Sequence, residues 1–232
     1  MIKLGIVGAG YIVREFLDNV KFLSADCGLQ VAGVFSRTYA NAETLAKSYG
    51  IANVYNSFEE LLASDIDTVY IATQNDSHFA YSQKALLANK NVLCEKPACV
   101  NHTQLSEILD LANKKGLKFM EAMRFLHIPA YVELKKRLKS KAYGNIISIE
   151  GSLGKISQRT YRHTKDLCGG ATMDLSIYPA TAVIDLLGYP DHIASGCIKN
   201  DAEVDSTMSA IFSYNSGIIG NVHASFTTLT RG

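Results

Sequence analysis

Near its start the chain reads IKLGIV (residues 2–7), GAGYIV (8–13) and REFLDNV (14–20). An apolar run, a glycine turn and an amphipathic segment in this order predict a strand, a tight turn and a helix. Gly8 permits the tight turn, and Gly10, which lacks a Cβ, lets a pyrophosphate approach the backbone where the helix begins. The stretch therefore predicts a dinucleotide-binding turn, with the cofactor-binding residues Gly8, Gly10, Tyr11 and Ile12.

The turn departs from the full dinucleotide pattern at Val13, so that it reads G-x-G-x-x-V. A small residue at this position normally lets the helix pack close to the strand. The alternative interpretation is a glycine-rich strand-to-helix turn that binds no ligand.

A second apolar run, residues 29–35, predicts the next strand, which ends in Ser36-Arg37. An acidic residue at this end would hold the ribose hydroxyls of NAD, but Asp26 precedes the strand and lies at its other end. A serine hydroxyl followed by a permanently charged guanidinium suits a 2′-phosphate instead. We therefore expect NADP as the cofactor, with NAD as the second choice. Alternatively, Arg37 is a solvated loop charge.

The composition is that of a globular protein of one or two domains, with 232 residues, 47% hydrophobic content and a formal net charge of +1. This charge gives no long-range attraction to nucleic acid or membrane, and we expect neither as a partner. The N-terminus lacks the features of a signal peptide, and no stretch approaches the roughly 18–20 apolar residues of a membrane helix, which predicts a cytoplasmic protein. Five cysteines without C-x-x-C spacing predict reduced, mostly buried thiols.

The first half of the chain alternates between predicted strands and helices. After Arg37, strands are expected at 53–55, 68–72, 91–95 and 118–122, and helices at 41–49, 78–88 and 101–115. A short helix is expected after Ser57, because Glu60 follows three residues later in a capping-box pattern. Continuous apolar strands are typical of parallel sheets covered on both faces. We therefore expect an α/β fold, a doubly wound parallel sheet, over residues 1–123.

The pattern changes in the second half, residues 124–232. Helices are predicted from Ala130 into the basic cluster at 135–137, and as one amphipathic helix over 171–187. Strands are predicted at 146–153, 193–199, 208–214 and 218–226, with a hairpin turn at Asn215-Ser216-Gly217. This half is therefore expected to be an α+β domain with a mostly antiparallel sheet.

Four sequence features occur in the order found in one known family. They are the glycine turn at 8–13, ATQNDSH at 72–78, EKP at 95–97, and GG at 169–170 ahead of DLSIYP at 174–179. Together they resemble the Gfo/Idh/MocA oxidoreductases over nearly the whole chain. Tyr178 stands where many members carry a histidine, so the chain is similar to the branch of dimeric dihydrodiol dehydrogenases, xylose dehydrogenases and glucose–fructose oxidoreductases.

The resemblance implies a Rossmann domain followed by a substrate-binding and dimerisation domain. It also implies hydride transfer between NAD(P) and the secondary alcohol or carbonyl group of a sugar, polyol or dihydrodiol-like substrate. In the family the Lys96–Pro97 bond is expected to be cis, with Lys96 directed at the nicotinamide ribose and the substrate oxygen. The further cofactor-binding residues expected are Ser36, Arg37, Thr73, Asn75, His78, Glu95 and Lys96.

The candidate chemistry uses a lysine, a tyrosine and an aspartate. Lys96 follows a predicted strand end, and its ammonium can hold a reacting hydroxyl and favour a nearby tyrosinate. Asp174 and Tyr178 are four residues apart on one predicted helix, so their side chains share a face and the phenol can shuttle the proton. Alternatively, 95–97 is an exposed turn and Tyr178, one of twelve tyrosines, is a core residue. The expected catalytic residues are Lys96, Asp174 and Tyr178, substrate binding adds Arg124 and His163, and no metal site is expected.

Two other functions use the same fold. One is an NAD(P)-binding regulator or scaffold without catalysis, against which the presence of Lys96 and Tyr178 argues. The other is a redox-assisted glycosidase with a tightly held cofactor. Family members are typically longer than this chain, so we expect the final strands of the second sheet to be missing. The resemblance further implies a homodimer or homotetramer formed through that sheet.

Overall fold

A computed structural model describes residues 1–22, 28–156 and 163–230; Asp26 and Cys27 lie outside these ranges. The chain forms two compact units, residues 1–122 and 123–232. We call them unit 1 and unit 2.

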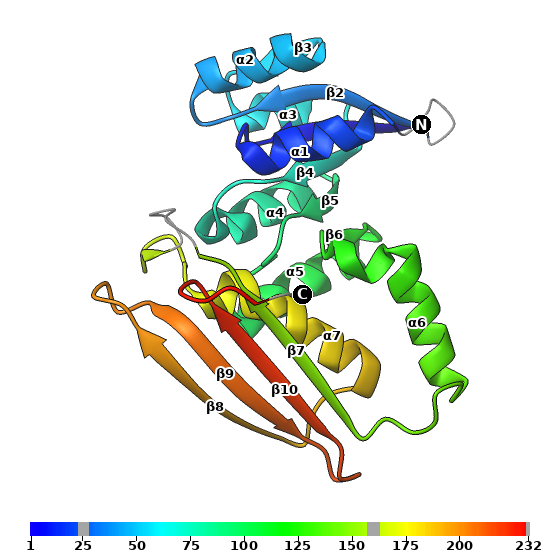
Figure 1. Ribbon diagram of the computed structural model, residues 1–232. Coiled ribbons are helices and arrows are strands. Elements are labelled where there is room, and N and C mark those ends of the chain that lie inside the picture. Colours follow the sequence, from blue (N-terminus) through cyan, green and yellow to red (C-terminus); the bar gives the residue numbers. More distant parts are fainter. Residues whose placement is uncertain (23–27, 157–162, 231–232) are drawn as a thin grey trace. The chain divides into compact units, whose positions relative to one another are not determined.

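Unit 1 is built on a parallel sheet with six described strands (Figure 1). They are β1 (Ile2–Val7), β2 (Leu29–Phe35), β3 (Asn53–Tyr55), β4 (Thr68–Ile71), β5 (Asn91–Cys94) and β6 (Phe119–Glu121). The order across the sheet is β3-β2-β1-β4-β5-β6, and every neighbouring pair is parallel. The winding reverses between β1 and β4, and open α/β sheets bind ligands at such a point. The predicted doubly wound sheet is confirmed.

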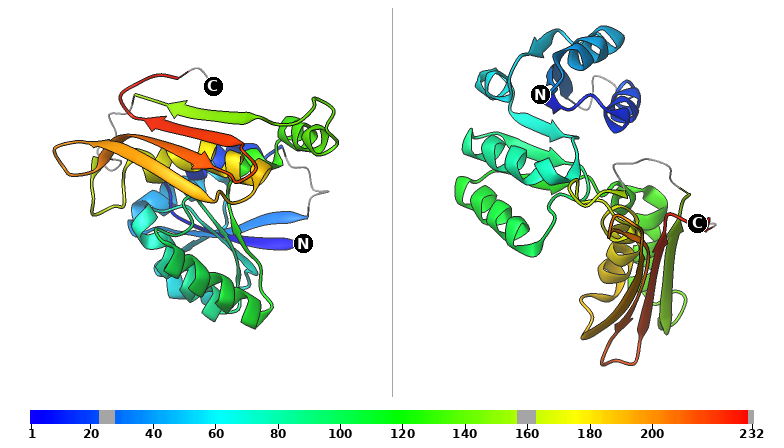
Figure 2. Two further views of the ribbon diagram at one scale, coloured as in Figure 1. Left: turned by 90° about the horizontal axis from the view of Figure 1, so that it is seen from below. Right: turned by 90° about the vertical axis from the view of Figure 1, so that its left-hand side faces the viewer.

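Helices cover both faces of this sheet (Figure 2, right). On one face, α1 (Tyr11–Val20) and α2 (Tyr39–Tyr49) share an apolar core with β1, β2 and β4. On the other, α3 (Phe58–Ala63), α4 (His78–Leu87) and α5 (His102–Lys115) pack against β4 and β5. The strands are therefore buried from both sides, which explains why they read as continuous apolar runs.

Local signals place the ends of these helices. The Ser57 hydroxyl accepts a hydrogen bond from the backbone N–H of Glu60 at 3.1 Å, as the capping pattern predicts. In a capping box the Glu60 carboxylate would accept from the backbone N–H of Ser57. Here it accepts from the backbone N–H of Asn56, one residue earlier, at 2.9 Å. At the far end of α5, Gly116 adopts φ +67°, the left-handed conformation that ends many helices.

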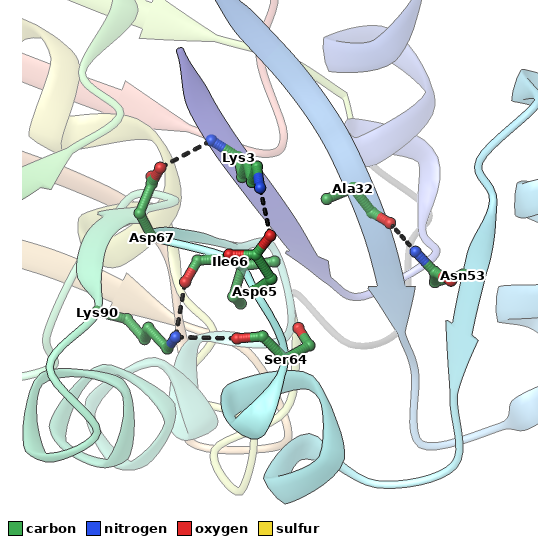
Figure 3. A network of polar contacts seen from close by, with 8 residues as sticks. All are labelled: Lys3, Ala32, Asn53, Ser64, Asp65, Ile66, Asp67 and Lys90. Atoms are coloured by element: carbon green, nitrogen blue, oxygen red, sulfur yellow. Dashed lines mark hydrogen bonds and ion pairs between the residues drawn. The ribbon is translucent and has the colours of Figure 1, made fainter.

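A polar network closes the amino ends of the strands (Figure 3). The backbone N–H of Lys3 donates to the Asp67 carboxylate at 2.9 Å, while the Lys3 ammonium pairs with Asp65. The Lys90 ammonium donates to the carbonyl oxygens of Ser64 at 3.1 Å and Ile66 at 2.6 Å. Side chains and backbone groups are paired with one another at this end of the sheet, whereas the motifs that resemble a cofactor site stand at the carboxyl ends of the strands.

Unit 2 consists of a mixed sheet covered on one face by helix (Figure 2, right). Helix α6 (Pro129–Lys139) precedes β7 (Ser148–Gly154), and α7 (Ile177–Leu187) precedes β8 (His192–Lys199), β9 (Asp205–Ser213) and β10 (Ile219–Ser225). The order is β7-β10-β9-β8. The pairs β8–β9 and β9–β10 are antiparallel, but β7 lies parallel to β10. The sheet is thus mostly antiparallel as expected, with a parallel edge pair that the sequence did not predict.

One predicted element of unit 2 needs correction. Instead of one regular helix over 171–187, the segment Thr172–Ser176 is wound as a π-helix and continues into α7. The Ser176 hydroxyl donates to the carbonyl oxygen of Thr172 at 2.7 Å within this turn. A π turn widens the helix by one residue, so the spacing that places residues four apart on one face does not apply directly across it.

Across the described ranges, none of the helices has both the length and the apolar character needed to cross a membrane. Four described cysteines are free thiols: Cys94 is buried, Cys99 and Cys168 are half-buried, and Cys197 is exposed. The expectation of mostly buried thiols is therefore wrong for this set. Burial raises the pKa of the Cys99 thiol to about 11, which keeps it protonated at neutral pH.

Candidate functional site

Gly8 directly follows β1, at the point where the sheet reverses its winding. It has φ +118°, and its backbone N–H donates to the carbonyl oxygen of Phe35 at 2.8 Å. A Cβ at this position would stand 2.4 Å from the carbonyl oxygen of Ala72. Both the backbone conformation and the close approach of β4 therefore require glycine.

Gly10 has a different role, because it caps α1 in an extended conformation and lies exposed. A Cβ added there would meet no atom within 4 Å. The fold itself does not need a glycine at this position, but a group approaching the helix N-terminus does. Open space over an uncapped helix start fits the pyrophosphate of a dinucleotide. Tyr11 and Ile12 follow on the first turn, exposed and half-buried respectively, and Val13 is wholly buried in the core.

The end of β2 carries Ser36, which is half-buried, and Arg37, which is exposed. The Arg37 guanidinium is held in place, since Nη2 donates to Oε1 of Gln74 at 3.0 Å. Gln74 belongs to the loop after β4, so the ends of β2 and β4 are joined over β1. Gln74 was not among the predicted site residues, although its place directly after a strand end is a usable signal.

The loop after β4 is braced by short polar contacts. The hydroxyls of Thr73 and Ser77 lie 2.8 Å apart, and the Ser77 hydroxyl donates to the carbonyl oxygen of Gln74 at 2.8 Å. Asn75 begins a short 3₁₀ turn, Asn75–Ser77, that leads into α4. Thr73 and Asn75 are half-buried at this end of the sheet.

The turn after β5 contains Glu95, Lys96 and a cis Lys96–Pro97 peptide bond, as the family resemblance implies. The Glu95 carboxylate accepts from the backbone N–H of Lys96 at 3.3 Å and from the Tyr70 hydroxyl at 2.8 Å. On the other side of Pro97, the backbone N–H of Ala98 donates to the Glu121 carboxylate at 2.7 Å. Hydrogen bonds from β4 and from the end of β6 thus fix the backbone on both sides of Lys96.

Tyr70 explains why Glu95 keeps its position. Its ring is 1% exposed and packs against Phe16, with ring centroids 4.3 Å apart. Burial, followed by the nearby Glu95 charge, raises the pKa of the Tyr70 hydroxyl, so it remains a hydrogen-bond donor. Sequence reasoning missed Tyr70; its signal is a phenol hydroxyl within the buried part of strand β4.

His78 lies behind these two turns and is wholly buried. Its Nδ1 is 2.8 Å from the carbonyl oxygen of Pro97, and its Nε2 is 3.3 Å from that of Thr73. Burial lowers the pKa of the imidazole, against the raising effect of both carbonyl groups. A neutral ring has one N–H, and the shorter contact assigns it to Nδ1. His78, the first residue of α4, therefore donates to the backbone of the turn that carries Lys96.

The predicted residues of unit 2 lie on its helical segments. Asp174 belongs to the π turn and Tyr178 to α7, and both are half-buried. The Tyr178 ring packs on Phe125, with centroids 6.2 Å apart, and Arg124 precedes Phe125 as an exposed residue. That Asp174 and Tyr178 share a face stays a prediction. His163 is half-buried, with its ring centroid 5.0 Å from that of Phe226.

The described part of the chain gathers its expected site residues in two groups. In unit 1, the predicted cofactor-binding residues stand at the carboxyl ends of β1, β2, β4 and β5, except that His78 lies beneath them. In unit 2, Arg124, Asp174 and Tyr178 stand on or beside helices. No group of three or more His, Cys, Asp or Glu side chains in the described ranges is arranged to hold a metal ion.

Known proteins resemble both halves of the chain. The model of the oxidoreductase family with an NAD-binding Rossmann fold, Gfo/Idh/MocA, matches residues 2–123, and the model of a Gfo/Idh/MocA C-terminal domain matches residues 131–231. Trans-1,2-dihydrobenzene-1,2-diol dehydrogenase of Bos taurus is 33% identical over 230 residues, which cover 97% of this chain and 67% of that protein. D-xylose 1-dehydrogenase (NADP(+)) 2 of Haloferax volcanii is 31% identical, with 97% and 69% covered.

A solved structure shows the same fold. A variant 3-ketoreductase from Actinomadura kijaniata, in complex with TDP-benzene and NADP, matches with a TM-score of 0.89 and 25% identity over 99% of this chain and 72% of that one. The chain spans about two thirds of the length of the two curated relatives. Because both family models match in order and together cover most of its length, the chain belongs to the Gfo/Idh/MocA family of NAD-binding oxidoreductases.

Proposed function

We propose that this protein is an NADP-preferring oxidoreductase that interconverts a secondary alcohol and its carbonyl or lactone. The observation that carries the proposal is the anchoring of the Lys96 turn, which is braced by Glu95, Glu121 and buried His78. A turn held by so many contacts keeps one lysine at a fixed place at the ligand-binding end of the sheet. An exposed turn without a function has no need of this bracing.

The preference for NADP is supported by the residues at the end of β2. A Ser36 hydroxyl and the Arg37 guanidinium replace the carboxylate that would hold the ribose hydroxyls of NAD. Gln74 holds the guanidinium at 3.0 Å, so less side-chain entropy is lost when a 2′-phosphate binds. The Haloferax volcanii relative is named as NADP-dependent, and the ketoreductase structure contains NADP.

The bound nicotinamide would supply or accept the hydride, and the chain's own side chains manage the proton of the reacting hydroxyl. We assign Tyr178 as the acid/base and Lys96 as the cation that holds the oxygen and favours the tyrosinate. Asp174 orients the substrate or the tyrosine. In alcohol oxidation the C–H bond breaks with its electron pair, and the O–H proton passes to the phenolate.

The substrate class is proposed from the polarity of these residues and from the relatives. An ammonium and a carboxylate suit a molecule with several hydroxyl groups, such as a sugar, a polyol or a dihydrodiol. Two relatives are named for a dihydrodiol and for xylose.

The experiment that tests this proposal is the substitution Tyr178→Phe. A panel of sugars, polyols and dihydrodiols is assayed with NADP through the absorbance of NADPH. We expect turnover of the best substrate to fall by about 100- to 10,000-fold, while the Kd for NADPH changes little. The matched control is Tyr189→Phe, which removes the same hydroxyl from an exposed tyrosine of unit 2. Unchanged turnover in Tyr178→Phe would contradict the proposed chemistry.

Lys96→Met tests whether Lys96 lowers the pKa of the tyrosine, as distinct from the proton transfer by Tyr178 itself. We expect lower turnover and a shift of the basic limb of the pH–rate profile to higher pH. The losses in Lys96→Met and Tyr178→Phe should be far from additive, because both residues act on one proton. Fully additive losses would show that the two side chains work independently.

A further inference from the structure

Asp205, the first residue of β9, holds the start of the helical segment that carries Asp174 and Tyr178. Its Oδ2 accepts two hydrogen bonds from Thr172, one from the backbone N–H at 2.6 Å and one from the hydroxyl at 2.8 Å. The first N–H groups of a helix have no partner within the helix, so a carboxylate here satisfies one of them and favours the helix dipole. The contact links β9 to the π turn across a long separation in sequence.

The backbone before Thr172 fits closely against this carboxylate. Gly170 has φ +119°, and a Cβ added to it would stand 2.2 Å from Oδ1 of Asp205. Ala171, between the two, is wholly buried. The second glycine of the GG pair is therefore required because the turn packs directly on Asp205.

Asp205 itself comes from a braced strand end. The Asn200 side chain accepts from the backbone N–H groups of Ala202 at 3.0 Å and Val204 at 3.1 Å. The backbone N–H of Asn200 donates to the carbonyl oxygen of Val204 at 2.9 Å, and Val204 is buried. Hydrogen bonds within the loop thus hold the backbone that precedes β9, and this fixes the position of Asp205 at the start of the strand.

The anchored segment contains an irregular winding that needs such support. π turns are rare and occur frequently at functional sites, because the extra residue re-aims the side chains that follow. Thr172 begins the π turn, Asp174 lies within it and Tyr178 follows it. Thr172 therefore stands at the start of the segment that carries both predicted catalytic side chains.

We propose that Asp205 is a positioning residue for the reaction: through Thr172 it fixes the π turn and thereby the placement of Asp174 and Tyr178. The inference rests on the proposed function. A carboxylate that only capped the helix would add stability without affecting turnover, and the test is designed around this difference.

The test compares four variants of the full chain. Asp205→Ala removes the anchor, Thr172→Val removes only the hydroxyl donor, and Thr172→Ser keeps both donors. Glu203→Gln is the control, since it alters a carboxylate of the same loop that pairs with Lys199 and not with the π turn. The measurements are kcat and KM for the best substrate, the Kd for NADPH and the melting temperature.

We expect Asp205→Ala to lower kcat by about 10- to 100-fold, because small displacements of catalytic groups have effects of this size. Thr172→Val should lose less, Thr172→Ser should restore most of the turnover, and the NADPH Kd should stay within about twofold, since the cofactor residues lie in unit 1. A fall in melting temperature with unchanged kcat would overturn the proposal.

A second measurement needs no substrate and separates this inference from the proposed function. With tyrosines labelled by ¹³C at Cζ, the Tyr178 resonance is assigned from its absence in Tyr178→Phe. Asp205→Ala should move this resonance, and Glu203→Gln should not. If Tyr178→Phe keeps its turnover, the proposed chemistry fails, while a moved resonance still supports the anchoring. An unmoved resonance in Asp205→Ala contradicts the anchoring whatever the activity.

Discussion

His78 Nδ1 lies 2.8 Å from the carbonyl oxygen of Pro97, inside unit 1 and directly behind the turn that carries Lys96. The histidine of the ATQNDSH motif thus contacts the EKP motif through the backbone. Because the ring has no exposed surface, it can affect the reaction through the position of the turn that it holds. The two motifs are therefore connected structurally, because the first residue of α4 supports the turn after β5.

The hydrogen bond from His78 predicts a difference between two substitutions. His78→Asn can keep a donor near Nδ1, whereas His78→Leu leaves the carbonyl oxygen of Pro97 without that donor. We expect His78→Leu to lose about 1–3 kcal/mol of unfolding free energy and to have a lower kcat. In His78→Asn, both the unfolding free energy and kcat should stay closer to those of the parent protein. Urea unfolding and steady-state kinetics measure the two effects.

His102→Asn is the control for these variants, because His102 is exposed at the start of α5. It should match the parent protein in both assays. Equal losses in His78→Leu and His78→Asn would show that ring volume, and not the hydrogen bond, is what matters.

Burial of His78 also predicts a dependence of stability on pH. Its pKa is lowered from the ordinary value of 6.5, so below that pH the unfolded chain binds a proton that the folded ring excludes. Unfolding free energy should therefore fall as the pH is lowered from about 6.5 to the folded pKa. Urea titrations at about pH 7.5 and 5.5 should show a smaller difference in His78→Asn than in the parent. A larger difference in the variant would contradict the assignment.

The two glycines of the first turn should respond differently to alanine. Gly8→Ala places a methyl group against the Ala72 carbonyl in a left-handed backbone region, so we expect a loss of about 1–3 kcal/mol or more in unfolding free energy. Gly10→Ala meets nothing in the chain and should change stability by less than about 0.5 kcal/mol. It should nevertheless weaken cofactor binding, because the methyl group fills the space of the pyrophosphate.

Thermal unfolding and NADPH titration of the two variants check this pair. Tight NADPH binding by a folded Gly10→Ala would place the cofactor away from the start of α1. A fully stable Gly8→Ala would show that β1 and β4 can separate at the turn.

Cofactor choice is tested at Arg37. Arg37→Ala should raise the Kd for NADPH by about 10- to 100-fold, since hydrogen bonds to a charged group contribute about 1.5–3 kcal/mol, and should leave the Kd for NADH nearly unchanged. Lys47→Ala removes an exposed charge from α2 in the same unit and is the control. Equal weakening of both cofactors, or tighter NADH binding by the parent protein, would refute the NADP preference.

The sequence was sufficient where structure follows from local patterns. Strand β3 and the Gly116 end of α5 agree with the predicted positions, because turn residues and apolar periodicity act over a few neighbours. The π turn was missed because Leu175 and Val183 are buried as in a regular helix, and one extra residue hardly changes the apolar pattern. The anchoring residues Asp205 and Glu121 were missed for another reason: each acts on a backbone group distant in sequence, and no periodicity records such a contact.

The parallel pairing of β7 with β10 sets an order of assembly for unit 2. During synthesis β7 leaves the ribosome before α7, β8 and β9, and its sheet neighbour is the last described strand to emerge. The hairpin of β9 and β10 closes locally, whereas β7 must wait with its hydrogen-bonding edge open and its apolar residues Ile149 and Leu153 uncovered. All six described strands of unit 1 precede β7 in the chain, so the first sheet has its strands available while the second still lacks the partner of β7.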